Sequence, residues 1–420
     1  MTASGARTGA RRVPRRRRTA EEIRRERAIR VGGIVLGAAA GLAASYLARR
    51  ADRVARDGGL VDWRRVEELA TTRLRSAAGA LSPADLAAAE PSYGRAMARI
   101  VPLLEARLGE PLPGVVERHA VVDRAGWVRA NIATFQHLVG RLEEAFHDRL
   151  HPQHPSLGGS LAALANRFLT TQQLGFLLGY LGSRVLGQYD VALLTAEAKP
   201  GRLLFVEENV RQTAKALNVP LEDFRVWIAL HETTHAFEFE AHPWLRPYLA
   251  ERLERQLAAF LDEAKAWSAE GAVELLKRWR RPEGEPLFAG FLTAEQRRLL
   301  RETQLVMSVL EGFSDWVMDD VGGSLVGDVT LLRERFEARR NQRRRGLDRL
   351  IGRLTGLDMK LEQYRRGERF VSGVARAGGR PAIAKLFAGP EALPSEAEMA
   401  DPEAWVRRML PRGAEGPVSA

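Results

Sequence analysis

Apolar residues recur every three to four positions through most of the chain, from about residue 60 to residue 405. This spacing places apolar side chains on one face of a helix, so it predicts a mainly α-helical protein. The most regular patterns predict helices at residues 127–146, 161–186, 221–239, 294–321 and 331–354. No internal repeat interrupts this pattern.

A short stretch in the middle of the chain has the character of β-structure. Residues 188–194 and 202–206 are rich in Val, Leu, Tyr and Phe, and Pro200-Gly201 stands between them as a turn signal. Two such runs flanking a turn predict a small β-hairpin.

The first 50 residues differ from the rest. Residues 31–48 carry no charge and are followed by Arg49 and Arg50. Eighteen helical residues span roughly 27 Å, close to the hydrocarbon core of a bilayer, so a single membrane span or signal anchor is one interpretation. Ala and Gly dominate the segment and insert weakly, so an Ala-rich helix packed on the body is the other. A span would leave the N-terminal tail in the cytoplasm. The localisation is therefore either cytoplasmic or membrane-associated.

Charge is concentrated in the N-terminal tail. The whole chain has a net charge of +11, and residues 1–30 hold eleven Arg and three Glu, which leaves +3 for the rest. The tail is expected to be disordered, or bound to an anionic surface. The body lacks the strong basic character of a nucleic-acid-binding domain, so no nucleic-acid partner is predicted. The chain contains no Cys, which excludes disulfides, thiolate metal sites and cysteine nucleophiles.

The strongest chemical signal is His231-Glu232-Thr233-Thr234-His235 within the predicted helix 221–239. Two imidazoles at i and i+4 share one helix face and can bind the same zinc ion, while Glu232 can act as general base toward the attacking water. The apolar run before His231 would bury this helix and hold the ligands rigidly.

A catalytic zinc ion needs a third protein ligand. No His follows His242, so a ligand from a later helix must be Asp or Glu. Glu311 is predicted as that ligand, with Asp315 one turn later accepting the outer N–H of a ligand His. An acidic patch without a metal is the alternative. His242 is a rival third ligand, but it lies seven residues beyond His235 instead of six, and Glu238 stands where a bend would need Gly.

The chain resembles the zincin-like metallopeptidase type 2 family over roughly residues 60–405. The resemblance rests on His231–His235 and on these further segments: 186–190, 205–209, 243–246, 307–312, 356–360, 363–365 and 367–371. It implies a mainly α-helical zincin-like fold with a small β-hairpin or sheet beside the active-site helix, with His231, Glu232 and His235 as ligand, base and ligand. One family branch carries a label associating it with deazaflavin-cofactor biosynthesis. Where Phe313 stands, a His is expected in the family.

These observations predict four regions: a disordered Arg-rich tail (1–30), the apolar segment (31–48), the metallohydrolase domain (60–405) and a flexible C-terminus (406–420). The predicted function is that of a Zn²⁺-dependent peptidase acting on peptides or a protein. The alternatives are a non-peptide amidase in cofactor metabolism and a catalytically silent zinc-bearing scaffold. Candidates for substrate binding or oxyanion stabilisation, by residue type alone, are His242, Arg246, Tyr248 and Tyr364. The sequence does not determine the oligomeric state.

Overall fold

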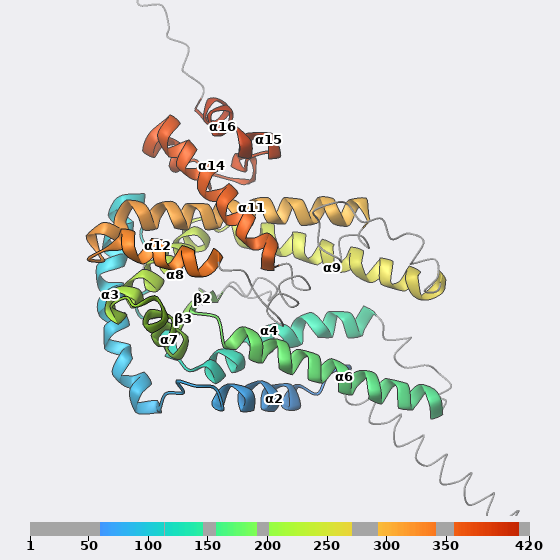
Figure 1. The fold of residues 1–420 in the computed structure, drawn as a ribbon. Coiled ribbons are helices and arrows are strands. Elements are labelled where there is room, and N and C mark those ends of the chain that lie inside the picture. The colour runs from blue at the N-terminus through green and yellow to red at the C-terminus, as the bar shows by residue number, and fades with distance from the viewer. Residues whose placement is uncertain are drawn as a thin grey trace, which may run out of the picture. The chain divides into compact units, whose positions relative to one another are not determined.

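The computed structural model describes residues 59–112, 114–145, 157–190, 201–270, 293–341 and 357–410 (Figure 1). By its contacts the chain divides into two compact units, Met1–Val61 with His147–Leu169 and Asp62–Phe146 with Thr170–Ala420. Everything that follows on the site concerns the second unit. The predicted N-terminal tail and the apolar segment 31–48 lie outside the described residues.

The described structure is mainly helical, as the apolar spacing predicts. Its longer helices are α2 (Trp63–Arg75), α3 (Pro83–Leu108), α4 (Arg124–Ala145), α6 (Leu157–Gly182), α7 (Glu207–Leu217), α8 (Leu221–Ala241), α9 (Leu245–Glu270), α11 (Ala294–Val321), α12 (Val329–Asn341) and α14 (Leu357–Ile383). Short helices α15 (Glu396–Ala400) and α16 (Pro402–Met409) follow near the C-terminal end.

Helix α11 begins and ends where the pattern predicts. The Thr293 side chain accepts a hydrogen bond from the Gln296 N–H, and the Gln296 side chain accepts one from the Thr293 N–H, a capping box that marks the start. The chain leaves the helix at Gly322 and Gly323. The predicted helix 331–354 is described only as far as Asn341, the end of α12.

The sheet has one strand more than the predicted hairpin. β2 (Gly187–Asp190) pairs antiparallel with β3 (Arg202–Val206), as predicted, and β1 (His119–Val122) pairs parallel with the other edge of β3. The prediction of a small β-hairpin or sheet is therefore confirmed, and the third strand was not indicated by the local pattern. β1 has only four residues and no apolar–polar alternation, and its partner is about eighty residues away, so no local signal marks it.

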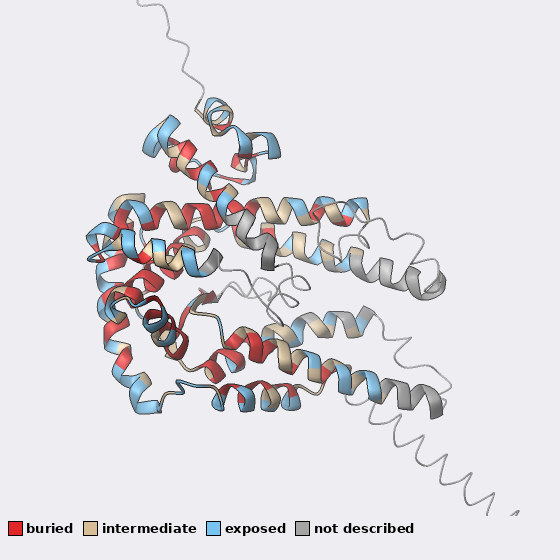
Figure 2. Ribbon diagram, in the orientation of Figure 1, coloured by how far each residue is buried: buried red, intermediate tan, exposed pale blue. Residues whose placement is uncertain are grey.

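Helix α8 lies at the centre of the second unit. It contacts α3, α7, α9 and α11 as well as strands β2 and β3. Most of its residues are buried, as the red segment in Figure 2 shows. A helix that is buried on nearly all sides needs neighbours on nearly all sides, and here they come from segments before and after it in the chain.

Helix α16 continues to Met409, past residue 406, from which a flexible C-terminus was predicted. Asp401 caps this helix by accepting from the Ala404 N–H, and the fully buried Trp405 donates to the carbonyl of Ala392. Residues 411–420 lie outside the description. Among the described helices, none is both long and apolar enough to cross a membrane.

Helices α11 and α14 cross at two glycines, Gly312 and Gly367. A Cβ atom on Gly312 would overlap the backbone of Gly367, and one on Gly367 would overlap the backbone of Ser308. The two backbones therefore approach more closely than any side chain would allow. Gly312 directly follows Glu311, so the close contact with Gly367 fixes the position of the α11 turn that carries Glu311 relative to α14.

Replacing Gly367 with Ala should destabilise the protein by about 1–3 kcal/mol, because backbone atoms on both helices would have to move apart. The matched control is Gly94→Ala in the middle of α3, where an added Cβ meets no atom within 4 Å. That change should stabilise the protein by about 0.5–1 kcal/mol through helix propensity. Thermal unfolding of the two variants measures both effects. Equal melting temperatures for Gly367→Ala and Gly94→Ala would contradict the close backbone contact between α11 and α14.

Candidate metal centre

Helix α8 presents His231 and His235 on one face. The two Nε2 atoms are 3.3 Å apart, and the rings meet edge to face with centroids 4.7 Å apart. Thr233 and Thr234 between them are fully buried, and each donates its hydroxyl to the carbonyl four residues earlier. The motif thus has one face toward the core and one face toward a cleft.

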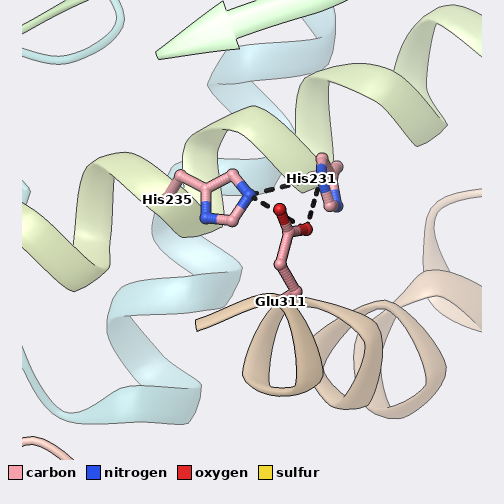
Figure 3. A group of neighbouring side chains, drawn as sticks. All are labelled: His231, His235 and Glu311. Atoms are coloured by element: carbon pink, nitrogen blue, oxygen red, sulfur yellow. Dashed lines mark hydrogen bonds and ion pairs between the residues drawn. The ribbon is translucent and has the colours of Figure 1, made fainter. Parts of the chain in front are cut away.

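Glu311 completes the group from α11 (Figure 3). Its Oε2 atom lies 3.8 Å from Nε2 of His231 and 3.8 Å from Nε2 of His235. One ligand atom from each of the three residues lies within 4.8 Å of the others. Ligands about 2.0–2.1 Å from a tetrahedral zinc ion lie roughly 3.3–3.4 Å apart. The distance of 3.3 Å between the two imidazoles has this spacing, and the two distances of 3.8 Å to Glu311 are slightly longer, so the three ligand atoms could hold one ion.

The electrostatics of the group favour a cation. Burial alone would lower the pKa of His235, but the carboxylates of Glu238, Glu311 and Glu232 outweigh burial and raise it to about 10. Burial raises the pKa of Glu238 to about 7, despite the opposing effect of His235. Three carboxylates around two imidazoles leave an excess of negative charge, which a divalent ion would balance.

Glu238 holds the ring of His235. It lies one turn further along α8, is fully buried, and its Oε2 atom is 2.7 Å from Nδ1 of His235. This contact leaves Nε2 directed at Glu311 and His231. For His235 the orienting carboxylate is Glu238, and that Asp315 accepts the outer N–H of a ligand His stays a prediction. Asp315 lines the cleft and contributes to the raised pKa of Arg333. The signal in the sequence was a Glu three residues after a ligand His, on the same helix face.

Replacing Glu238 with Gln should lower zinc affinity about 10- to 100-fold, the range typical of outer-shell carboxylates. Gln keeps the size of the side chain but cannot supply the negative charge that stabilises the imidazole as a ligand. The control is Glu222→Gln in the first turn of α8, whose carboxylate contacts Ser92 and Arg225. Competition with a zinc chelator measures both, and equal affinities would show that Glu238 has no influence on the centre.

Glu232 is buried between α8 and strand β2. Its Oε2 atom accepts a hydrogen bond of 3.0 Å from the backbone N–H of Tyr189. Gly187 lies so close that a Cβ atom there would be 2.7 Å from Cγ of Glu232. Both contacts fix the carboxylate of Glu232 beside the two His residues, at the wall of the cleft.

The strand that positions Glu232 is itself anchored to α8. The Tyr189 hydroxyl donates to Oε1 of Glu240 at 2.8 Å and accepts from the Gly201 N–H at 3.2 Å. Arg118 pairs with both oxygens of Glu240 at 2.7 Å and also donates to the Gly201 carbonyl. These contacts tie β2 to the last turn of α8.

A cleft of about 580 Å³ contains the candidate metal centre. It is lined by His231, Glu232, His235 and Glu311, and it extends along α8 in both directions between α11, α12 and strand β2. A concave, largely apolar cleft with a few converging polar groups is the usual form of a small-molecule or peptide site.

Two of the residues predicted for substrate binding or oxyanion stabilisation, His242 and Tyr248, take packing positions. His242 ends α8 and lies between the rings of Phe237 and Phe387, where burial lowers its pKa. Tyr248 packs against Trp244 and under the guanidinium of Arg252. Among the described residues, His242, Arg246 and Tyr248 are not part of the cleft lining. Tyr364 falls in the part of α14 whose side chains are not described.

Phe313, where a His is expected in the family, is a core residue. It is 2 % exposed and packs on Phe237, Trp316 and Phe387. The position thus belongs to the aromatic core beneath the centre, whereas Glu311, two residues earlier, faces the two His side chains.

Comparison with known proteins agrees with this architecture. The sequence profile of a zincin-like metallopeptidase family matches residues 61–406. Among solved structures, the chain is similar to "a putative hydrolase with a novel fold" from Chloroflexus aurantiacus, with 35% sequence identity and a TM-score of 0.62 over 84% of this chain and 100% of that one. No match was found among curated proteins. The profile spans nearly the whole helical body, including α8 and α11, and this chain therefore belongs to the zincin-like metallopeptidase family.

Proposed function

We infer that the protein is a zinc-dependent peptidase whose metal is held by His231, His235 and Glu311. The observation that carries this proposal is the convergence of three ligand atoms within 4.8 Å, from two helices that are distant in sequence. Two imidazoles and one carboxylate are the ligand set of several catalytic zinc sites, in which the fourth position is left to water or substrate. The family to which the chain belongs implies a metal as well.

The bound ion would supply a Lewis acid that polarises the scissile carbonyl and acidifies the attacking water. Glu232 would take the proton of that water and deliver it to the leaving amine. The Tyr189 N–H holds one oxygen of Glu232 and so fixes the carboxylate at the wall of the cleft. Glu238 would keep His235 in the tautomer that presents Nε2 as the ligand.

Strand β2 favours a peptide as the substrate. It is an edge strand of the described sheet, and residues 187–189 line the cleft beside Glu232. An edge strand offers backbone N–H and C=O groups that an extended peptide can pair with, although the Tyr189 N–H of this strand is already bound to Glu232. A scaffold protein would have no use for a carboxylate such as Glu232 next to an open coordination position, so this residue also argues against a structural zinc site.

The test is a zinc-loaded preparation of the full chain, incubated with a broad peptide mixture whose products are identified by mass spectrometry. We expect one zinc ion per chain, cleavage of peptides, loss of cleavage on removal of the ion with a chelator, and recovery when zinc is returned. Zinc binding without cleavage of any peptide would refute the peptidase proposal, and absence of zinc binding would refute the metal centre as well.

A further inference from the structure

The cleft has two wings, one on each side of the ligands. Toward the start of α8 it is walled by Trp227, Ile228, Met318 and Phe336, here called the Trp227 wing. Toward the end of α8 it is walled by Phe239, Leu249 and Met307, here called the Met307 wing. α11 runs antiparallel to α8, since Gly322 near its end lies against Trp227, so each helix contributes to both wings.

The walls of the Trp227 wing are apolar and firmly packed. Trp227, Ile228 and Met318 line the cleft, yet each is at most 5% exposed. Phe336 reaches the wing from α12 and packs against Phe224 of the core, with ring centroids 6.2 Å apart. Side chains supported in this way keep their shape, so this wing is a preformed apolar recess next to His231.

The charged groups beside this wing pair with one another but carry a net negative charge, because one cation, Arg333, contacts three acids and Asp315 also lines the cleft. The Arg333 guanidinium donates to Oε1 of Glu337 at 2.8 Å and also contacts Asp319 and Glu368. A carboxylate entering the wing would meet these acids, and a cation would meet Arg333. The excess of acids disfavours a carboxylate, whereas an apolar side chain gains burial against four apolar walls.

We propose that the Trp227 wing is the specificity pocket of the enzyme and takes a large apolar side chain, such as that of Phe or Leu, adjacent to the scissile bond. This inference rests on the proposed peptidase function. Burying a large apolar side chain in place of a small or charged one should favour the substrate by about 10- to 100-fold.

Two variants on the same helix test the assignment. Met318→Phe adds volume to the Trp227 wing, and Met307→Phe adds volume to the Met307 wing; these positions lie on either side of Glu311 along α11. Peptide libraries analysed by mass spectrometry should show a preference for Phe and Leu on one side of the cleaved bond. Met318→Phe should reduce that preference about tenfold in favour of smaller residues, whereas Met307→Phe should alter selection only on the other side of the bond. Zinc content should be the same in all three proteins.

A binding measurement separates failure of the pocket from failure of the peptidase. The hydroxamates of Phe, Leu, Ala, Asp and Lys are titrated into zinc-loaded protein by calorimetry, which requires no turnover. Tighter binding of the Phe and Leu compounds, weakened by Met318→Phe, would support the pocket even if no peptide were cleaved. Equal affinities for all five compounds, or a Phe and Leu preference unchanged by Met318→Phe, would overturn the pocket and leave the peptidase standing.

Discussion

Replacing Glu232 with Gln should leave one zinc ion bound and lower kcat about 10²- to 10⁴-fold, the usual contribution of a general base. Gln has the same shape as Glu, so it fits the narrow space beside Gly187 and can still accept from the Tyr189 N–H. The ligands His231, His235 and Glu311 are untouched. Only the ability to take a proton from the attacking water is lost.

Zinc content by mass spectrometry and steady-state rates on a cleaved peptide measure the two effects separately. The control is Glu222→Gln on the same helix, which should keep both zinc and rate. Loss of zinc in Glu232→Gln would mean that this carboxylate helps to hold the ion, and an unchanged rate would mean that it is not the base.

Replacing Glu311 with Ala should lower zinc affinity by more than the 10- to 100-fold expected of an outer-shell change, because one of three protein ligands is removed. Activity should fall with the zinc content and should not return at ordinary zinc concentrations. The two imidazoles would lose the carboxylate that lies 3.8 Å from each of them.

The matched control is Asp315→Asn, one turn further along α11. Asp315 lines the cleft but is not part of the three-residue ligand group. We expect it to keep zinc binding within a few-fold of the wild type. If Asp315→Asn lost as much zinc as Glu311→Ala, the assignment of the third ligand would be wrong. Thermal unfolding of the metal-free proteins shows whether either change damages the fold itself.

Much of the helical framework was predictable because its signals are local. The start of α11 is marked by Thr293 and Gln296 within one turn. The two His residues of α8 are four positions apart, which places them on one face of a helix. The choice of Glu311 used the absence of a His after His242 and the spacing of one turn between Glu311 and Asp315. Long helices with regular apolar periodicity are the elements for which sequence patterns are most informative.

What the sequence did not reveal depends on contacts between distant segments. Strand β1 exists because β3 pairs with it, and the support of Glu232 by Tyr189 and Gly187 depends on how β2 meets α8. The clustering of acids on Arg333 likewise joins α11, α12 and α14. The contact between Glu238 and His235 is different, because both residues lie on one helix. Their spacing of three residues is visible in the sequence, yet only Asp315 was predicted to orient a ligand His.

Because α11 and α14 cross at Gly312 and Gly367, metal binding at the candidate centre and the docking of α14 would be thermodynamically linked. A ligand that binds only the assembled state stabilises every contact that state requires. Zinc held by Glu311 would therefore strengthen the docking of α14, and by reciprocity any change that loosens α14 would weaken zinc binding. Substitutions around residue 367, distant in sequence from all three ligands, would then lower metal affinity before they unfold the protein.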